Sequence, residues 1–232
     1  MDPIDTIILA GGLGTRLRQA VPDLPKPLAP VNGRPFLDIL LRQLAAFAGI
    51  RKVVLAIGYK AEVIKTHYQG NHGHRFDLEF CVENVPMGTG GAILQALPFT
   101  GSRDVLVMNG DSYIDFDLER LLATHSERAA EVTMVVTEVE DTARFGSIKL
   151  DTSSSRVVEF VEKGSGGGRG FINAGCYLLA RKVFEREPLQ PVSFEKDILP
   201  RHLHSTYAQV ARGKFIDIGV PESYRFAAEY LG

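Results

Sequence analysis

The stretch LAGGLGTRL, residues 9–17, follows directly on an apolar run at residues 4–9 that we expect to form a buried strand. Glycines placed directly after a strand let backbone N–H groups come close to a phosphate chain. Arg16 adds a forked cation that suits phosphate oxygens. Lys26 adds a point charge between two prolines, which stiffen the backbone around it and help to fix its direction. Together these residues predict a site for a phosphate chain at the end of this strand.

Two familiar phosphate-binding loops do not match this stretch. The loop lacks the Gly-Lys-Ser/Thr ending of a P-loop. A dinucleotide-binding fingerprint that uses Gly12 and Gly14 would need a third glycine at position 17, where the chain has Leu17. The sequence therefore disfavours both a P-loop protein and a dinucleotide-dependent reductase.

Outward from this loop, short apolar runs alternate with helix-like segments. In the first half we expect strands at residues 4–9, 53–57, 78–82 and 105–108 and helices at residues 35–47, 61–68, 89–97 and 117–126. Strands that are apolar throughout and alternate with helices are typical of a mainly parallel sheet covered on both faces. In the second half we expect strands at residues 132–139 and 171–179, a hairpin at 147–161 and helices at 193–199 and 221–230.

The composition is that of an ordinary soluble globular protein. The 232 residues are 45% hydrophobic and 23% charged, and 26 basic against 28 acidic residues give a formal net charge of −2. Because there is no basic excess, we expect neither nucleic acid nor a membrane as a partner. The apolar runs fall far short of the ~20 residues of a membrane span, and the start does not read as a signal peptide. Two widely separated cysteines fit a reducing compartment, so the expected location is cytoplasmic.

Two aspartates are candidate ligands of a magnesium ion. Asp111 follows the expected strand at residues 105–108, and a carboxylate at the carboxyl end of a parallel strand faces the ligand crevice. Asp217 is embedded in apolar neighbours, so its charge needs a partner, and a magnesium ion shared with Asp111 would supply one. The alternatives are a turn or capping role for Asp111 and a simple pairing of Asp217 with an arginine.

The segment LAGGLGTRLRQAVPDLPKPLAPVNGRPFL, residues 9–37, resembles the signature of the sugar-1-phosphate nucleotidyltransferases, and later motifs follow in that family's order. The resemblance implies a single Rossmann-like domain over residues 1–232, a three-layer α/β/α fold with a mixed, mainly parallel central sheet. Residues 1–130 would be the nucleotide-binding half and residues 131–232 the sugar-phosphate-binding half. The implied reaction is attack by a sugar 1-phosphate oxygen on the α-phosphorus of a nucleoside triphosphate, with Mg²⁺ as cofactor and pyrophosphate as leaving group.

The resemblance also assigns roles to individual residues. Nucleotide contacts are implied for Leu9, Ala10, Gly11, Gly12, Gly14, Thr15, Arg16, Lys26, Gly88, Thr89, Asn109 and Gly110. Sugar-phosphate contacts are implied for Gly146, Glu162, Lys163, Asn173 and Gly175. The implied catalytic residues are Arg16, Lys26, Asp111 and Lys163, and the implied metal ligands are Asp111 and Asp217.

Within the sugar-phosphate group, Lys163 is the candidate cation for the attacking phosphate and Glu162 the candidate partner of a sugar hydroxyl. Asn173 can both donate to and accept from a hydroxyl, and Gly175 would leave room for the sugar ring. A charged run at residues 195–197 is either one end of the sugar site or an exposed surface, and the sequence leaves both open.

The turn GTGG, residues 88–91, resembles the base-reading turn of the guanylyl members of the family. The expected substrates are therefore GTP and a sugar 1-phosphate, with a heptose 1-phosphate favoured and a GDP-heptose made for surface glycans. A mannose 1-phosphate, another nucleotide, or a non-catalytic regulatory subunit with the same fold are the alternatives. A homo-oligomer such as a dimer is also expected.

Overall fold

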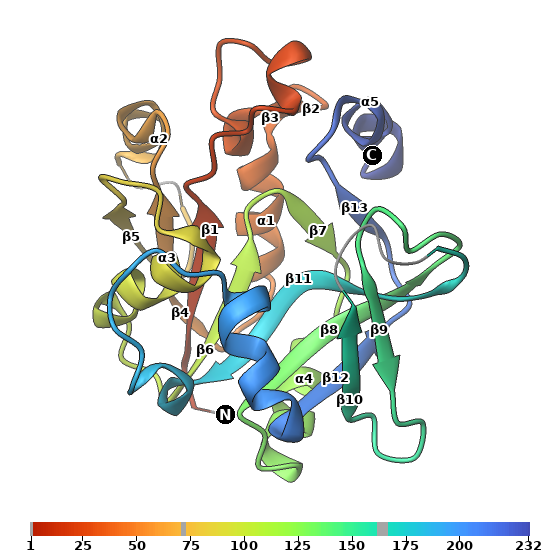
Figure 1. Ribbon diagram of the computed structural model, residues 1–232. Helices are drawn as coiled ribbons and strands as arrows, with labels where there is room; N and C mark the ends of the chain where they lie inside the picture. Colours follow the sequence, from red (N-terminus) through yellow and green to blue (C-terminus); the bar gives the residue numbers. More distant parts are fainter. Residues whose placement is uncertain (1, 71–72, 162–166) are drawn as a thin grey trace.

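Figure 1 shows the computed structural model, which describes residues 2–70, 73–161 and 167–232. In this part of the chain, a central sheet contains nine strands. They are β1 (Ile4–Ala10), β4 (Ile50–Ile57), β5 (Asp77–Val82), β6 (Asp104–Asn109), β8 (Val132–Val139), β9 (Ser147–Leu150), β10 (Val157–Val161), β11 (Gly170–Ala180) and β12 (Thr206–Ala211). Two small antiparallel pairs lie outside this sheet, β2 (Pro30–Val31) with β3 (Arg34–Pro35) and β7 (Ser112–Ile114) with β13 (Phe215–Asp217).

The strand order confirms the expected mixed, mainly parallel sheet. It runs β10-β9-β11-β6-β1-β4-β5, with β8 paired to β11 and β12 paired to β8. β6, β1, β4 and β5 are parallel neighbours, and β8 and β12 are also parallel. β11 runs antiparallel to β6, β8 and β9, so one continuous sheet crosses both halves of the chain.

Helices cover both faces of the sheet and make a three-layer fold. They are α1 (Phe36–Ala45), α2 (Ala61–Tyr68), α3 (Gly88–Ala96), α4 (Leu118–Glu127) and α5 (Pro221–Tyr230). In β1, the side chain of Ile8 packs in the core on the side of α1, α2 and α4, whereas its neighbour Ile7 packs in the core on the side of α3. This alternation is the period-2 pattern of a strand buried on both faces. Figure 1 shows α3 in front of the sheet and α1 and α4 behind it.

Five strands and one helix differ from the sequence-based expectations. β2 and β3 have two residues each and β7 and β13 three each, too few to show a periodic pattern, and the sequence also does not predict β12. The helix expected at residues 193–199 is a π-helical turn, Phe194–Ile198, continued by a 3₁₀ segment, Leu199–Ser205. Its expected cap is present, because the Ser193 hydroxyl accepts from the Lys196 N–H at 3.2 Å. Among the described residues, no helix is long and apolar enough to span a membrane.

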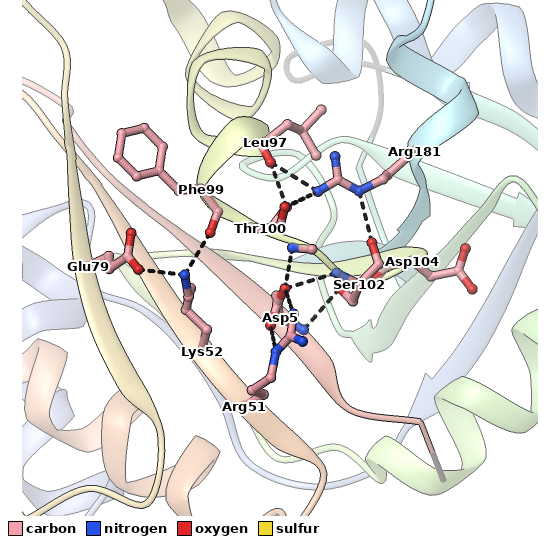
Figure 2. Close-up of polar contacts among 11 residues, drawn as sticks. Asp5, Arg51, Lys52, Glu79, Leu97, Phe99, Thr100, Ser102, Asp104 and Arg181 are labelled. Atoms are coloured by element: carbon pink, nitrogen blue, oxygen red, sulfur yellow. Dashed lines mark hydrogen bonds and ion pairs between the residues drawn. The ribbon is translucent and has the colours of Figure 1, made fainter.

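A buried carboxylate joins the amino ends of β1 and β4 to the loop before β6 (Figure 2). The Asp5 side chain is 0% exposed, and both of its oxygens accept from Arg51, at 2.9 and 2.6 Å. The N–H groups of Gly101 and Ser102 add further bonds at 2.6 and 2.9 Å. Burial alone would raise the pKa of Asp5, but these hydrogen bonds outweigh it and hold that pKa below its ordinary value. This end of the sheet is therefore closed by a saturated polar cluster.

Candidate active site

A cleft of about 460 Å³ lies at the opposite end, where β1 and β6 finish and α3 begins. Leu9 of β1 is in register with Asn109 of β6, so the loops that follow the two strands lie side by side. Ligands of α/β sheets bind at the carboxyl ends of the strands. Every residue predicted to contact nucleotide lines this cleft: Leu9, Ala10, Gly11, Gly12, Gly14, Thr15, Arg16, Lys26, Gly88, Thr89, Asn109 and Gly110.

Close neighbouring atoms explain why two positions in this cleft are occupied by glycine. A Cβ atom at Gly11 would lie 2.2 Å from Oε1 of Glu83, and one at Gly110 would lie 2.7 Å from the carbonyl oxygen of Leu9. Gly14 has a φ of +61°, a conformation that favours glycine. At these positions, therefore, no side chain fills the space along the edge of the cleft.

Lys26 meets the first candidate metal ligand in the structure. It opens a 3₁₀ turn, Lys26–Leu28, with Pro25 immediately before it and Pro27 within it. Its ammonium group donates to Oδ2 of Asp111. Lys26 is 12% exposed, whereas Asp111 is 37% exposed, so the carboxylate still faces the cleft.

A second cavity of about 240 Å³ adjoins the first. Arg16, Thr89, Asn109 and Asp111 line both cavities, so the two form one continuous site. Asn173, Gly175 and Asp217 also line the second cavity. Gly146 does not line it, although the preceding residue Phe145 does. Glu162 and Lys163 lie outside the described residues.

The space at Gly175 differs from the expectation that it leaves room for a sugar ring. Gly175 has a φ of +73°, and a Cβ atom there would lie 2.5 Å from Nδ2 of Asn109. Because glycine has no side chain, the space beside Gly175 is occupied by the amide of Asn109, which lines both cavities.

Asp217 lies close to Asp111 because β13 pairs with β7. In that pair Asp217 is opposite Ser112, and the Ile218 N–H donates to the Asp111 carbonyl oxygen at 2.9 Å. The Gly219 N–H donates to Oδ1 of Asp217 at 2.5 Å, and Arg144 reaches Oδ2 at 3.3 Å. The arginine pairing considered from the sequence is therefore present, but Asp217 still lines the second cavity.

These two carboxylates suit a magnesium ion. Mg²⁺ takes hard oxygen ligands and is commonly held by one or two carboxylates plus substrate phosphates. Among the described residues, no group of three or more histidine, cysteine, aspartate or glutamate side chains could hold a metal. Asp111 and Asp217 on the wall of one cavity fit the two-carboxylate arrangement, and their sharing of an ion stays a prediction.

Backbone hydrogen bonds to Val192 hold the turn at the start of α3 in place. The Gly90 and Gly91 N–H groups donate to the Val192 carbonyl oxygen at 2.9 and 3.2 Å, and the Val192 N–H donates to Met87 at 2.9 Å. Gly88 has a φ of +69°, and a Cβ atom there would lie 2.6 Å from the same Val192 oxygen. The turn is therefore pre-formed, with Gly88 and Thr89 facing the cleft.

Sequence reasoning missed Glu83, which lines the nucleotide cleft. It follows β5 directly, so the rule that ligands meet the carboxyl ends of strands could have found it. Burial raises the pKa of its carboxyl, although the Met87 N–H donates to Oε2 at 3.1 Å and opposes that effect. A carboxylate desolvated in this way gains from additional hydrogen-bond donors on a ligand.

Comparison with known proteins shows which family the chain belongs to. A model of the nucleotidyl transferase family matches residues 5–231, so the chain belongs to that family, as its motifs predicted. A D-glycero-alpha-D-manno-heptose 1-phosphate guanylyltransferase of Aneurinibacillus thermoaerophilus is 38% identical to it over 98% of each chain. A mannose-1-phosphate guanylyltransferase of Mycobacterium tuberculosis is 36% identical over 95% of this chain and 62% of its own.

Among solved structures, HddC from Yersinia pseudotuberculosis complexed with GMP-PN has a TM-score of 0.87 and 37% identity. The match covers 99% of this chain and 100% of that one. The fold of the whole described chain is therefore that of a nucleotidyltransferase.

Proposed function

We propose that the protein transfers GMP from GTP to a sugar 1-phosphate, giving a GDP-sugar and pyrophosphate. The favoured acceptor is D-glycero-α-D-manno-heptose 1-phosphate, with the product used for surface glycans. Family membership and the two adjoining cavities support the reaction class. A cytoplasmic location and a homodimeric state belong to the same proposal.

The observation that carries the choice of GTP is Glu83. Guanine presents two neighbouring donors, its ring N1–H and its exocyclic amino group, and a carboxylate accepts through two oxygens. Uracil and thymine present one N–H between two carbonyl oxygens, which a carboxylate would repel. Glu83 lies in the cleft beside Gly11 and Met87, next to the pre-formed turn that contains Gly88. A site whose polar groups pair with one base leaves those groups unpaired with another, so it can discriminate strongly.

In this mechanism the protein supplies charge and position rather than a nucleophile. A sugar 1-phosphate is an anion at neutral pH and can attack the α-phosphorus directly. Arg16 lines both cavities, so its guanidinium can offset negative charge where donor and acceptor meet. Lys26 would stabilise the charge that develops on the triphosphate and leaving pyrophosphate. Mg²⁺ held by Asp111 and Asp217 would neutralise the phosphates and polarise the α-phosphoryl group.

The test is pyrophosphate release from a matrix of four nucleoside triphosphates and a panel of sugar 1-phosphates. GTP with a heptose 1-phosphate should give the highest kcat/KM, and mannose 1-phosphate is the comparison that decides the sugar. Glu83→Gln should raise the KM for GTP roughly tenfold, as the loss of charged hydrogen bonds does. Glu79→Gln, within the strand β5 that Glu83 follows, is the matched control. Equal turnover with UTP or dTTP in the wild type would overturn the assignment of the base.

A further inference from the structure

A chain of hydrogen bonds connects the nucleotide cleft with the sugar segment behind the wall of the second cavity. Its centre is Glu195, a residue of the π-helical turn that lines this cavity. The Thr89 hydroxyl donates to Oε2 of Glu195 at 2.5 Å. The Tyr177 hydroxyl donates to Oε1 at 3.1 Å, and Asn173 in turn donates through Nδ2 to the Tyr177 oxygen. One carboxylate thus contacts a residue of each half of the site.

The directions of these bonds are fixed by chemistry. A carboxylate only accepts, so both hydroxyls must donate to Glu195. Tyr177 is 0% exposed, and burial followed by the nearby Glu195 charge raises the pKa of its phenol far above the ordinary value. The phenol therefore keeps its proton for Glu195, and its oxygen accepts from the amide of Asn173.

The orientation of Asn173 follows from this order. Its Oδ1 accepts from the Gly175 N–H at 2.9 Å, and Nδ2 donates to Tyr177. An amide flipped by 180° would place donor against donor at Gly175. An amide nitrogen carries two hydrogens, so one further N–H can serve a ligand in the cavity that Asn173 lines. The Gly175 N–H and the buried tyrosine together therefore determine which group of Asn173 meets a sugar hydroxyl.

The other arm of Glu195 acts on the turn at the start of α3. The Thr89 oxygen accepts from the Phe194 N–H at 2.9 Å while its proton is given to Glu195. Thr89 lines both cavities, and the same turn is also held by backbone bonds to Val192. Loss of Glu195 should therefore change the position of Thr89 less than that of Asn173, because only the hydrogen bonds through Tyr177 connect Glu195 with the Asn173 amide.

We propose that Glu195 is a positioning residue that orients Asn173 through Tyr177 and Thr89 directly, and so sets the affinity for both substrates. The proposal rests on the proposed function for the identity of those substrates. Tyr177 is the selective element, because it connects Glu195 to the sugar side alone.

The experiment compares Glu195→Gln and Tyr177→Phe in steady-state kinetics with both substrates varied. In Glu195→Gln, one hydroxyl would face an amide N–H, so the KM for sugar phosphate should rise about tenfold and that for GTP about threefold. Tyr177→Phe should raise the KM for sugar phosphate about fivefold and leave that for GTP within about twofold. Tyr68→Phe is the matched control, because Tyr68 is 3% exposed and donates to Asp38 at 2.6 Å. It should leave both constants unchanged at a similar loss of Tm.

Tyr177→Phe raising both constants equally, or leaving both unchanged, would overturn the proposal. So would Glu195→Gln with a wild-type KM for sugar phosphate. If Glu195→Gln does not fold, the selective effect of Tyr177→Phe decides. Calorimetry with a non-hydrolysable GTP analogue separates this proposal from the proposed function: a wild type without pyrophosphate release would refute the function. The hydrogen-bond chain would still require weaker analogue binding in Glu195→Gln and unchanged binding in Tyr177→Phe.

Discussion

At the amino end of the central sheet, the Asp5 carboxylate is 0% exposed and accepts from Arg51, Gly101 and Ser102 (Figure 2). At the carboxyl end, the Asp111 carboxylate is 37% exposed and pairs with Lys26 on the wall of two cavities. Both are aspartates beside a basic side chain, Asp5 within β1 and Asp111 in the turn that follows β6. The Asp5 carboxylate has its hydrogen bonds satisfied within the protein and contributes to stability. The Asp111 carboxylate is accessible, so it can still bind a ligand. Because both aspartates have an ion pair, an ion pair alone does not distinguish them. The number of hydrogen-bond donors around each carboxylate and its exposed fraction distinguish the structural Asp5 from the candidate ligand-binding Asp111.

The largest effect should come from the candidate metal ligands. Asp111→Asn and Asp217→Asn should each lower kcat roughly 10³-fold, since a catalytic metal contributes several kcal/mol of charge stabilisation. The double variant should lose little more than either single one, because residues that act as a unit are not additive. Pyrophosphate release across a magnesium titration measures this. Fully multiplicative losses, or unchanged magnesium dependence in the single variants, would mean that the two aspartates do not share an ion.

Alanine variants of two lysines, one at each end of the sheet, allow the two ends to be compared directly. Lys26→Ala should lower kcat roughly 10²- to 10³-fold, as the loss of one preorganised charge-stabilising donor does, with little change in folding. Lys52→Ala is the counterpart at the amino end, where Lys52 contacts Glu79 at 2.5 Å and the Phe99 carbonyl oxygen at 3.1 Å (Figure 2). It should leave kcat unchanged. Wild-type turnover in a folded Lys26→Ala protein would contradict the role given to this lysine.

The smallest effect, and one on stability alone, is expected for Asp5→Asn. An amide in place of this carboxylate would leave buried donors without acceptors and lower the free energy of unfolding by roughly 2–3 kcal/mol, with kcat per folded molecule unchanged. Chemical denaturation monitored by circular dichroism measures the difference. A variant with lower kcat at full folding would show that this cluster also affects the active site.

The same variant tests the pKa of Asp5. Because that pKa is lower in the folded than in the unfolded protein, the carboxylate stabilises the fold fully above its unfolded pKa of about 3.9. The contribution is lost as the pH falls through the folded pKa. The difference in stability between wild type and Asp5→Asn should therefore narrow below about pH 4. A difference that grows in acid would refute the assigned direction.

The sequence predicted the parts of the site that are local and contiguous. The glycine loop follows β1 and Asp111 follows β6, two strands with a strong apolar pattern, so strand and site residue are recognised together. Lys26 lies further along the same continuous motif, between two prolines. Asp217 was found from its apolar neighbours and from the family resemblance, but β13, which ends at this residue, was not predicted, because three residues carry no period. Glu83 was missed although it also follows a strand, since a single glutamate carries no motif of its own.

The hydrogen-bond chain centred on Glu195 is a feature that the sequence could not predict. The sequence analysis singled out Thr89 and the charged run at residues 195–197, but nothing in the sequence connects either of them with Tyr177. Tyr177 belongs to an apolar strand and gives no sign of a polar partner. Only the packing of the turn at residues 194–198 against α3 and β11 brings their hydrogen-bonding groups together. Side-chain geometry of this kind depends on tertiary contacts that no local pattern contains.

The pairing of β7 with β13 also has a consequence for the order of events in biosynthesis. One strand follows Asp111 and the other ends at Asp217, so the two carboxylates meet only after about a hundred intervening residues have been made. Contacts of such long sequence separation form late, because the loop between them must first close. A nascent chain could thus display a folded glycine loop well before it could do chemistry. Catalytic competence would therefore depend on this long-range strand pairing and follow the formation of the glycine loop.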